Sequence, residues 1–303
     1  MSGAPICLID ASIYIFRYYF SLPDRWFDQH HGYGTAAVYG YTGFLLSLLE
    51  AHRPSHVAAC FDESLGSGFR HQLYPAYKSS RVLPDAALAF QLQACREASE
   101  LLGIASFASD LYEADDLLGS LYHYCGQQAA PVAVLTRDKD LAQVLTRPED
   151  YLWDYSAQQR YYHADIIARF GVPPDALVDY LALVGDSSDD IPGVPGVGPK
   201  TAAALLMAFG SLDALWLRRG EIANLPLRGA GTLAAKLEAF RPQIALAQQL
   251  ARIKMDIDLV SHFDDLRHKA INIDDFSEFC TQMGWGQTPA RRAAKLLPPE
   301  VCV

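Results

Sequence analysis

The chain has 303 residues, of which half are hydrophobic and a fifth are charged. This composition is typical of a globular protein and allows one large α/β domain with a small helical addition. No apolar run approaches the roughly 18 residues that span a bilayer, and the first residues lack the basic and apolar regions of a signal peptide. We therefore expect a cytoplasmic protein with no membrane partner. None of the six cysteines forms a C-x-x-C pair, which favours buried reduced thiols.

The formal net charge of −10 is unusual for a protein that binds nucleic acid, because such proteins usually present a basic face. Nine acidic residues, however, fall within a few short motifs, and without them the formal charge would be −1. If those nine residues hold metal ions, the rest of the chain is nearly neutral and can carry local basic patches. The acidity therefore argues only against non-specific binding to duplex DNA through bulk charge.

Three short apolar runs are predicted β-strands, and each leads to an aspartate at its carboxyl end. They are Pro5–Ile9 followed by Asp10, His56–Phe61 followed by Asp62, and Pro131–Leu135 followed shortly by Asp138. Alternating strands and helices predict an α/β fold with a mostly parallel central sheet flanked by helices. Ligands bind such sheets beyond the carboxyl ends of the strands, so we expect the three aspartates at the binding edge.

Hydrophobic spacing predicts helices over Thr35–Glu50, Ala114–Tyr124, Asp175–Val184 and Thr201–Phe209. The segment over 62–81 differs, because it mixes glycine, aromatic and basic residues before another helical stretch begins. After about residue 210 we expect a helical region with a flexible turn and a weakly patterned tail.

The strongest chemical signal is a set of nine carboxylates in four groups that the predicted topology brings to one edge of the sheet. Its members are Asp10, Asp62, Glu113, Asp115, Asp116, Asp138, Asp140, Asp186 and Asp189. Uncompensated carboxylates at such an edge repel one another, and hard divalent cations relieve that repulsion because they prefer carboxylate oxygens and water. Two such ions about 4 Å apart can clamp the attacking and leaving oxygens of a phosphodiester.

Each acidic group also has a structural explanation when it is taken alone. Asp115 and Asp116 suit the first turn of a helix, Asp138 suits an N-cap, and Asp186 and Asp189 suit a turn. Four groups at one predicted binding edge are hard to explain in this way. We therefore expect a site for two or more Mg²⁺ or Mn²⁺ ions.

A second motif over 193–201, Gly-Val-Pro-Gly-Val-Gly-Pro-Lys-Thr, leads into a predicted helix. Gly196 and Gly198 let the backbone approach a ligand closely, and the helix N-terminus with Lys200 and Thr201 offers N–H groups and charge to an anion. A proline before the lysine excludes a Walker A loop. The motif indicates a helix–hairpin–helix that grips a DNA backbone without reading its sequence, although an ordinary glycine-rich turn remains the alternative.

With these motifs placed, the chain resembles the flap endonuclease / 5′–3′ exonuclease family from about residue 5 to about residue 260, and in particular the 5′-nuclease domain of bacterial DNA polymerase I. The motifs that carry the resemblance are Phe69-Arg70, Tyr77-Lys78 with Arg81, Glu113-Ala-Asp-Asp, Asp138-Lys-Asp, and the stretch over 185–201 that begins Gly-Asp-Ser-Ser-Asp-Asp.

The resemblance implies a structure-specific 5′ nuclease that hydrolyses DNA near 5′ ends, flaps or branches by two-metal-ion catalysis. It assigns Asp10, Asp62, Glu113, Asp115 and Asp116 to a first metal cluster and the other four acids to a second. It places Lys78 and Arg81 as catalytic residues on a helical arch (about 66–102), with Lys78 pointing into water in the free enzyme. Arg70 and Tyr77 would contact DNA, and the backbone carbonyls of Val194 and Val197 would bind a K⁺ ion.

The chain departs from the family pattern at two positions: Arg137 stands where glycine is common, and Asp190 where asparagine is common. Neither change removes a matched ligand. We expect Asp190 to add a stray negative charge near the hairpin and to weaken the grip on DNA slightly.

We expect a stand-alone, monomeric enzyme with a catalytic α/β domain over 1–172, a helix–hairpin–helix region of the helix–three-turn–helix kind over 173–260, and a tail over 261–303 that packs on the core. One alternative is a catalytically silent protein that binds branched DNA, which the complete acid set disfavours. The other is a ribonuclease that acts on RNA–DNA hybrids.

Overall fold

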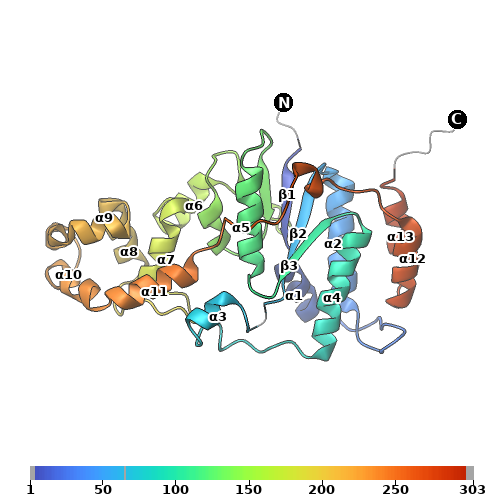
Figure 1. Ribbon diagram of the computed structural model, residues 1–303, viewed down its shortest axis with the longest axis horizontal. Helices are drawn as coiled ribbons and strands as arrows, with labels where there is room; N and C mark the ends of the chain where they lie inside the picture. The colour runs from blue at the N-terminus through green and yellow to red at the C-terminus, as the bar shows by residue number, and fades with distance from the viewer. Residues whose placement is uncertain (1–3, 65, 298–303) are drawn as a thin grey trace. The chain divides into compact units, whose positions relative to one another are not determined.

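The computed structural model describes residues 4–64 and 66–297. They fall into two compact units (Figure 1). The first unit lies within 1–65, 83–137 and 255–303, and the second within 66–82 and 138–254. Each unit is therefore assembled from separate stretches of the chain.

The first unit alternates strands and helices before it ends in two further helices. Its elements are β1 (Ile6–Asp10), α1 (Ala11–Ser21), α2 (Ala36–His52), β2 (Val57–Asp62), α4 (Ala86–Leu101), β3 (Ala105–Ser109), α5 (Ala114–Cys125), β4 (Val132–Leu135), the 3-10 helix η4 (Phe263–Leu266), α12 (Ile273–Gln282) and α13 (Thr288–Ala294).

The four strands of this unit are all parallel and lie in the order β3-β2-β1-β4. All of β1 and β4 is buried, as continuous apolar strands covered on both faces must be. Helices α1, α2 and α4 cover one face, and α5 covers the other (Figure 1). The predicted parallel sheet is thus confirmed, with one refinement: Asp10 and Asp62 are the last residues of their strands.

The C-terminal helices α12 and α13 pack on α4 and α2 of the same unit. Trp285 follows α12 and is 6% exposed, and its indole Nε1 donates a hydrogen bond of 3.1 Å to the Thr35 hydroxyl. Thr35 in turn donates to the carbonyl of Met283 at 2.9 Å. The Trp285 ring also meets Tyr39 and Phe279 edge-on. These contacts join the tail to the start of α2.

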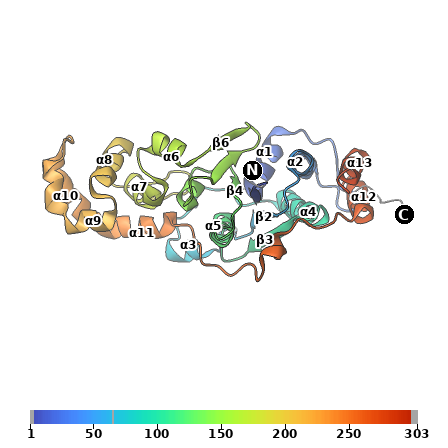
Figure 2. The same ribbon diagram turned by 90° about the horizontal axis from the view of Figure 1, so that it is seen from above.

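The second unit is mainly helical, with one antiparallel hairpin formed by β5 (Tyr151–Asp154) and β6 (Gln159–Tyr161). Its helices are α3 (Phe69–Leu73), η1 (Asp140–Val144), α6 (His163–Phe170), η2 (Pro174–Ala176), α7 (Leu177–Val184), α8 (Pro199–Phe209), α9 (Leu212–Leu217), η3 (Arg219–Asn224), α10 (Ala230–Ala239) and α11 (Arg241–Ala251). Helices α7 and α11 lie side by side in both ribbon views (Figures 1 and 2).

Arg70 anchors the short helix α3 to the end of α11. Its side chain is buried at 3% exposure, and its guanidinium donates to two backbone carbonyls, those of Leu250 at 2.7 Å and Arg252 at 2.8 Å. A helix C-terminus has carbonyls without intrahelical partners, and a cation there is favoured by the helix dipole. The contact therefore holds the first part of the segment over 66–82 against the end of α11.

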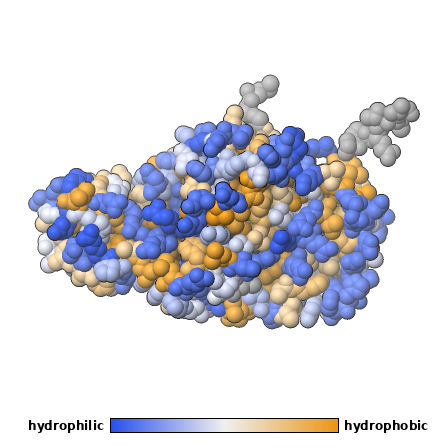
Figure 3. Space-filling model, in the orientation of Figure 1, coloured by the Kyte–Doolittle hydropathy of each residue, from blue (hydrophilic) through white to orange (hydrophobic). Residues whose placement is uncertain are grey.

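On the face shown in Figure 3, hydrophilic side chains alternate with small hydrophobic patches. Large exposed hydrophobic side chains are scattered over separate elements, as with Phe20 on α1 and Leu217 on α9. Among the described residues, no helix is both long and apolar enough to cross a membrane. The five described cysteines are buried and form no disulfide, and Cys302 lies outside the described residues.

Replacing Trp285 by alanine is expected to lower the free energy of unfolding by about 3–5 kcal/mol, because a buried aromatic ring and one hydrogen bond are lost. Phe20→Ala is the matched control, since Phe20 is 78% exposed, and we expect a change below about 1 kcal/mol. Urea denaturation of both variants measures the difference. Equal losses for the two variants would contradict the packing described for Trp285.

Arg70→Lys is expected to lower the free energy of unfolding by about 1–3 kcal/mol, because an ammonium cannot reproduce the guanidinium fork that spans two carbonyls. Arg169→Lys, at an exposed position in the same unit, serves as the control and is expected to be nearly neutral. If Arg70→Lys were as stable as the control in urea denaturation, the anchoring role would be wrong.

Candidate functional site

The first unit contains five of the nine predicted ligands, which we name the first carboxylate group: Asp10, Asp62, Glu113, Asp115 and Asp116. Three of them are almost fully buried, with exposures of 5% for Asp10, 5% for Glu113 and 0% for Asp116. Charged carboxylates are rarely buried unless hydrogen bonds or cations compensate them. Each of these three buried carboxylates therefore needs a hydrogen-bond donor or a cation as its partner.

Asp10 and Asp62 end the neighbouring strands β1 and β2. The Asp10 carboxylate accepts a hydrogen bond from the Thr136 hydroxyl at 2.8 Å and caps α1 through the Ile13 amide at 3.3 Å. Asp62 accepts a hydrogen bond from the Ser64 hydroxyl at 2.9 Å. Both carboxylates are thus held at the carboxyl edge of the sheet, as the sequence predicted.

Glu113 and Asp116 form a reciprocal capping box at the start of α5. The Asp116 carboxylate accepts the Glu113 amide at 3.2 Å, and the Glu113 side chain accepts the Asp116 amide. The positive end of the helix dipole favours both charges. Burial raises the pKa of the Cys60 thiol well above its ordinary value, and the charges of Asp10 and Asp115 raise it further.

The other four ligands, the second carboxylate group, lie in the second unit: Asp138, Asp140, Asp186 and Asp189. Lys139 lies between two of them, with its ammonium 2.6 Å from Asp186 and 3.0 Å from Asp140. Burial and the neighbouring Asp138 charge raise the pKa of Asp140 to about 7. Burial also raises the pKa of Asp186, but hydrogen bonds from Lys139 and Ser188 outweigh it and leave that pKa below its ordinary value. Lys139 thus compensates two carboxylates at once.

The backbone around Asp186 is fixed by two glycines that pack against each other. Gly185 has a φ of +80°, and a side chain on Gly185 or Gly193 would collide with backbone atoms of the opposite strand of the loop. Asp186 and Ile191 exchange both backbone hydrogen bonds, at 2.9 and 2.8 Å. This closes the loop that presents Asp186 and Asp189.

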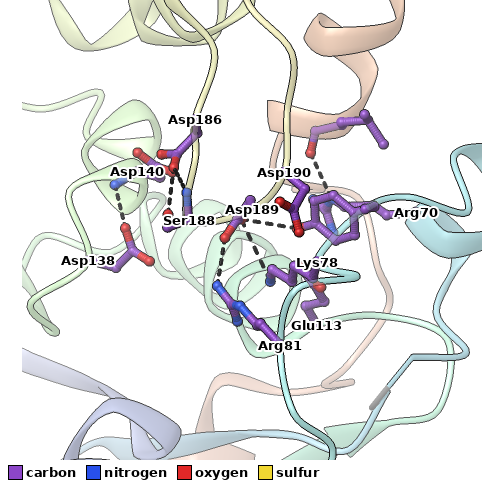
Figure 4. Close-up of polar contacts among 12 residues, drawn as sticks. Arg70, Lys78, Arg81, Glu113, Asp138, Asp140, Asp186, Ser188, Asp189 and Asp190 are labelled. Carbon is purple, nitrogen blue, oxygen red and sulfur yellow. Dashed lines mark hydrogen bonds and ion pairs between the residues drawn. The ribbon is translucent and has the colours of Figure 1, made fainter.

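Asp189 is the meeting point of three side chains from the turn over 74–81, and Figure 4 shows Lys78 and Arg81 beside it. Arg81 donates to one carboxylate oxygen at 2.6 Å, and the Tyr77 hydroxyl donates to the other at 3.2 Å. The Lys78 ammonium is 3.7 Å from the same carboxylate, and its side chain is only 10% exposed. The expectation that Lys78 points into water in the free protein is therefore wrong, because the paired charge of Asp189 offsets its partial loss of solvent.

The expectation for Asp190 is also corrected. Its carboxylate accepts two hydrogen bonds from Ser80, at 3.0 Å from the amide and 2.8 Å from the hydroxyl. These bonds, with the Arg81 charge, keep the pKa of Asp190 below its ordinary value. Asp190 is thus a partner of the segment that carries Lys78 and Arg81, and its charge is not a stray one.

Two residues predicted to contact DNA are buried in this structure. The Arg70 guanidinium is hydrogen-bonded to backbone carbonyls at the end of α11, and the Tyr77 side chain is 2% exposed. For Tyr77 to stack on a base, its ring must leave these contacts. Both DNA contacts remain predictions, and the structure assigns each residue a packing role in the present conformation.

The predicted hairpin precedes α8, whose N-cap is Gly198. Lys200 is exposed at this helix start, and Thr201 is half-buried beside it. Gly196 has a φ of +78°, which glycine adopts without strain. The arrangement leaves helix N–H groups and an ammonium available to an anion.

The hairpin loop already makes several hydrogen bonds where a K⁺ ion was predicted. The Val194 carbonyl accepts the Val197 amide at 2.9 Å, and the Lys236 ammonium donates to the Pro195 carbonyl at 3.2 Å. A cationic side chain therefore lies beside the loop. Potassium binding by Val194 and Val197 stays a prediction.

The donor set suits divalent cations, because all nine predicted ligands are carboxylates and several are buried. Within 4–64 and 66–297, however, no three His, Cys, Asp or Glu side chains are gathered in positions ready to hold a metal ion. In this structure Lys139, Lys78 and Arg81 pair with the second group, while hydroxyl groups and helix-capping amides donate hydrogen bonds to the first.

Lys139, Ser80 and Ser188 also contact the predicted site residues, although the sequence did not predict these contacts. Lys139 had a visible signal, since it stands between two aspartates in an acidic motif. Ser80 had none, because its partner is 110 residues away along the chain.

Two family models match consecutive parts of the chain. The N-terminal, resolvase-like domain of 5′–3′ exonucleases matches residues 5–171, and their C-terminal SAM fold matches residues 172–274. The chain is 38% identical over 267 residues to DNA polymerase I of Pseudomonas aeruginosa, covering 88% of this chain and 29% of that protein. It is 32% identical over 255 residues to the 5′–3′ exonuclease of Buchnera aphidicola, covering 84% of this chain and 88% of that protein.

Solved structures share the fold at low sequence identity. The T5 5′-exonuclease with bound divalent metal ions (zinc) has a TM-score of 0.65 at 18% identity, covering 96% of this chain and 98% of that one. The catalytic core of Rad2 in complex with a DNA substrate has a TM-score of 0.63 at 17% identity, covering 98% and 93%. The chain spans less than a third of the DNA polymerase I relatives that it matches. Since the first family model alone covers more than half of the chain, the chain belongs to the 5′–3′ exonuclease family.

Proposed function

We propose that this protein is a structure-specific 5′ nuclease, acting as a 5′–3′ exonuclease or flap endonuclease on DNA that carries 5′ ends, flaps or branches. Its reaction is the hydrolysis of a phosphodiester bond with two or more Mg²⁺ or Mn²⁺ ions. We also propose that it acts as a cytoplasmic monomer, with a catalytic domain over 1–172, a DNA-binding region over 173–260 and a packed tail over 261–303.

The observation that carries this proposal is the pairing of Lys78 and Arg81 with Asp189. Phosphodiester hydrolysis by metal ions needs two kinds of group close to each other. One is a set of oxygen ligands that hold the metal ions, and the other is a set of cationic side chains that face the phosphoryl oxygens. Asp189 follows Asp186 by three residues in one loop, and Lys139 pairs with Asp186, so this loop sets two carboxylates against three cations. A plain structural ion pair would not need this density of charge.

In this proposal the two carboxylate groups hold the divalent ions, which when bound would neutralise charge on the phosphate and make water a better nucleophile. Lys78 and Arg81 release Asp189 and turn to the phosphoryl oxygens, where charge grows toward the transition state. Arginine matches phosphate geometry with two parallel donors, and lysine contributes a compact charge. Neither side chain serves as a nucleophile.

The hairpin and the start of α8 hold the duplex part of the substrate. Lys200, Thr201 and the backbone at Gly196 and Gly198 would contact phosphates rather than bases, so binding would depend on shape and not on sequence. The Rad2 structure named above holds a DNA substrate, and its similar fold is compatible with this use of the chain.

Two other functions make different predictions for the same substrate. A silent DNA-binding protein would bind a flapped duplex and leave it intact in Mg²⁺. A ribonuclease would cut an RNA flap or the RNA strand of a hybrid and spare the DNA flap. A 5′-labelled flap assay with DNA and RNA versions, in Mg²⁺ and in EDTA, therefore tests the proposal directly: cutting of DNA in Mg²⁺ alone supports it.

Asp116→Asn is expected to lower single-turnover cleavage of a 5′ DNA flap at least about 10²-fold, because one ligand charge is lost. The asparagine oxygen can still accept the Glu113 amide, so the helix cap should survive. We therefore expect an unfolding free energy within about 0.5 kcal/mol of wild type. Dissociation constants measured with Ca²⁺ in place of Mg²⁺ should change less than about twofold, because the hairpin is untouched.

Asp213→Asn is the matched control, since Asp213 is an exposed first-turn aspartate on α9, and it should cut at the wild-type rate. Full cleavage by Asp116→Asn, or undiminished cleavage by wild type in EDTA, would contradict metal-dependent catalysis through the first carboxylate group.

A further inference from the structure

The turn over 74–81 carries Tyr77, Lys78 and Arg81, yet it contains no α-helix or β-strand. Its own backbone hydrogen bonds close short turns only, such as Tyr77 to Tyr74 at 2.9 Å and Arg81 to Lys78 at 3.0 Å. Lys78 itself has a left-handed φ of 49°, which disfavours a side chain that has a Cβ. Contacts from outside the turn must therefore stabilise this conformation.

Two consecutive residues, Asp189 and Asp190, supply several of those contacts. The Asp189 carbonyl accepts the Lys78 amide at 3.0 Å, and the Asp189 carboxylate is the partner of the Tyr77, Lys78 and Arg81 side chains. Asp190 receives the amide and hydroxyl of Ser80 on one carboxylate oxygen. Asp190 also has a left-handed φ of 55°, a conformation that aspartate tolerates better than most residues.

We propose that Asp190, acting through Ser80, is a positioning residue that fixes the turn over 74–81 and so holds Lys78 and Arg81 beside Asp189. Ser80 lies between the two cations in the sequence, so fixing its amide and hydroxyl restricts the backbone on both sides. The ion pairs alone would leave two long side chains free to sample many rotamers. The two bonds to a carboxylate supply a directional restraint that the ion pairs lack.

The part of this inference that predicts a DNA cleavage rate rests on the proposed function, because Lys78 and Arg81 act on a phosphate only in that function. Its structural part can be tested without any nuclease activity. The two parts therefore have separate measurements.

The first measurement is limited proteolysis with trypsin, which cleaves after lysine and arginine and reports the population of locally open states. In Asp190→Ala, cleavage at the Lys78–Ser79 and Arg81–Val82 bonds is expected to be about five- to tenfold faster than in wild type, because two charge-assisted hydrogen bonds are lost. Ser80→Ala removes one of the two bonds and is expected to give a smaller increase. Asp190→Asn keeps an acceptor oxygen and should stay within about twofold of wild type.

Cleavage at Arg228–Gly229, an exposed site in the same unit, is the internal control and should not change. Asp213→Ala removes an acid elsewhere in that unit and should leave all three bonds as in wild type. Equal cleavage of the turn in wild type and Asp190→Ala would overturn the proposal. So would Asp190→Asn behaving like Asp190→Ala, because charge rather than a hydrogen-bonded geometry would then be the cause.

The second measurement is single-turnover cleavage of a 5′ DNA flap. Asp190→Ala is expected to lower the rate about five- to tenfold, while the dissociation constant measured in Ca²⁺ changes less than about twofold. Asp190→Asn should recover most of the rate. In a Lys78→Ala background the further loss from Asp190→Ala should be clearly smaller, since residues that act through one another are not additive.

Fully additive losses would overturn the positioning role. A wild-type protein that does not cut in Mg²⁺ would contradict the proposed function, yet the trypsin results would still decide whether Asp190 fixes the turn. The failure of the one proposal is thereby distinguishable from the failure of the other.

Discussion

Repulsion among the carboxylates within each of the two groups is the constraint on which the structure around them depends. Such a set is unfavourable unless each charge has a partner. In the first unit the partners are hydroxyls and helix N-termini, as for Asp10 and Asp116. In the second unit they are cations: Lys139 joins Asp140 to Asp186, and Arg81 is bound to Asp189. The protein thus carries its own compensation for charges that divalent ions would otherwise neutralise.

This compensation links the chemistry of the site to the conformation of the turn over 74–81. The cations that balance Asp189 are the same residues that we propose act on the phosphate, so releasing the carboxylate and engaging the substrate are one exchange of partners. Arg70 fixes the start of this segment at α11, and Ser80 fixes its middle at Asp190. In the proposed function these two anchors would hold the segment while Lys78 and Arg81 exchange Asp189 for the phosphate.

Much of this could be predicted from the sequence, because short apolar strands that end in aspartate have a strong pattern. The strand ends at Asp10 and Asp62 and the helix start at Glu113 were expected within one residue of where they lie. The surroundings of Lys78 and Asp190 were not, because both depend on contacts between segments 108 to 112 residues apart. Local spacing carries no information on such pairs, and comparison with the family pattern showed only that Asp190 was unusual.

The most direct test of the central claim is the stability of Lys139→Gln with and without metal at pH 8, which is above the pKa of about 7 that the Asp140 carboxyl has while Lys139 lies beside it. Lys139 is only partly buried, so we expect a loss of about 1–2 kcal/mol in EDTA from the repulsion that appears between Asp140 and Asp186. Saturating Mn²⁺ should restore most of it and stabilise the variant more than wild type. A variant as stable as wild type in EDTA, or one that gains no more from Mn²⁺ than wild type does, would contradict the claim that Lys139 stands in for metal charge at this site.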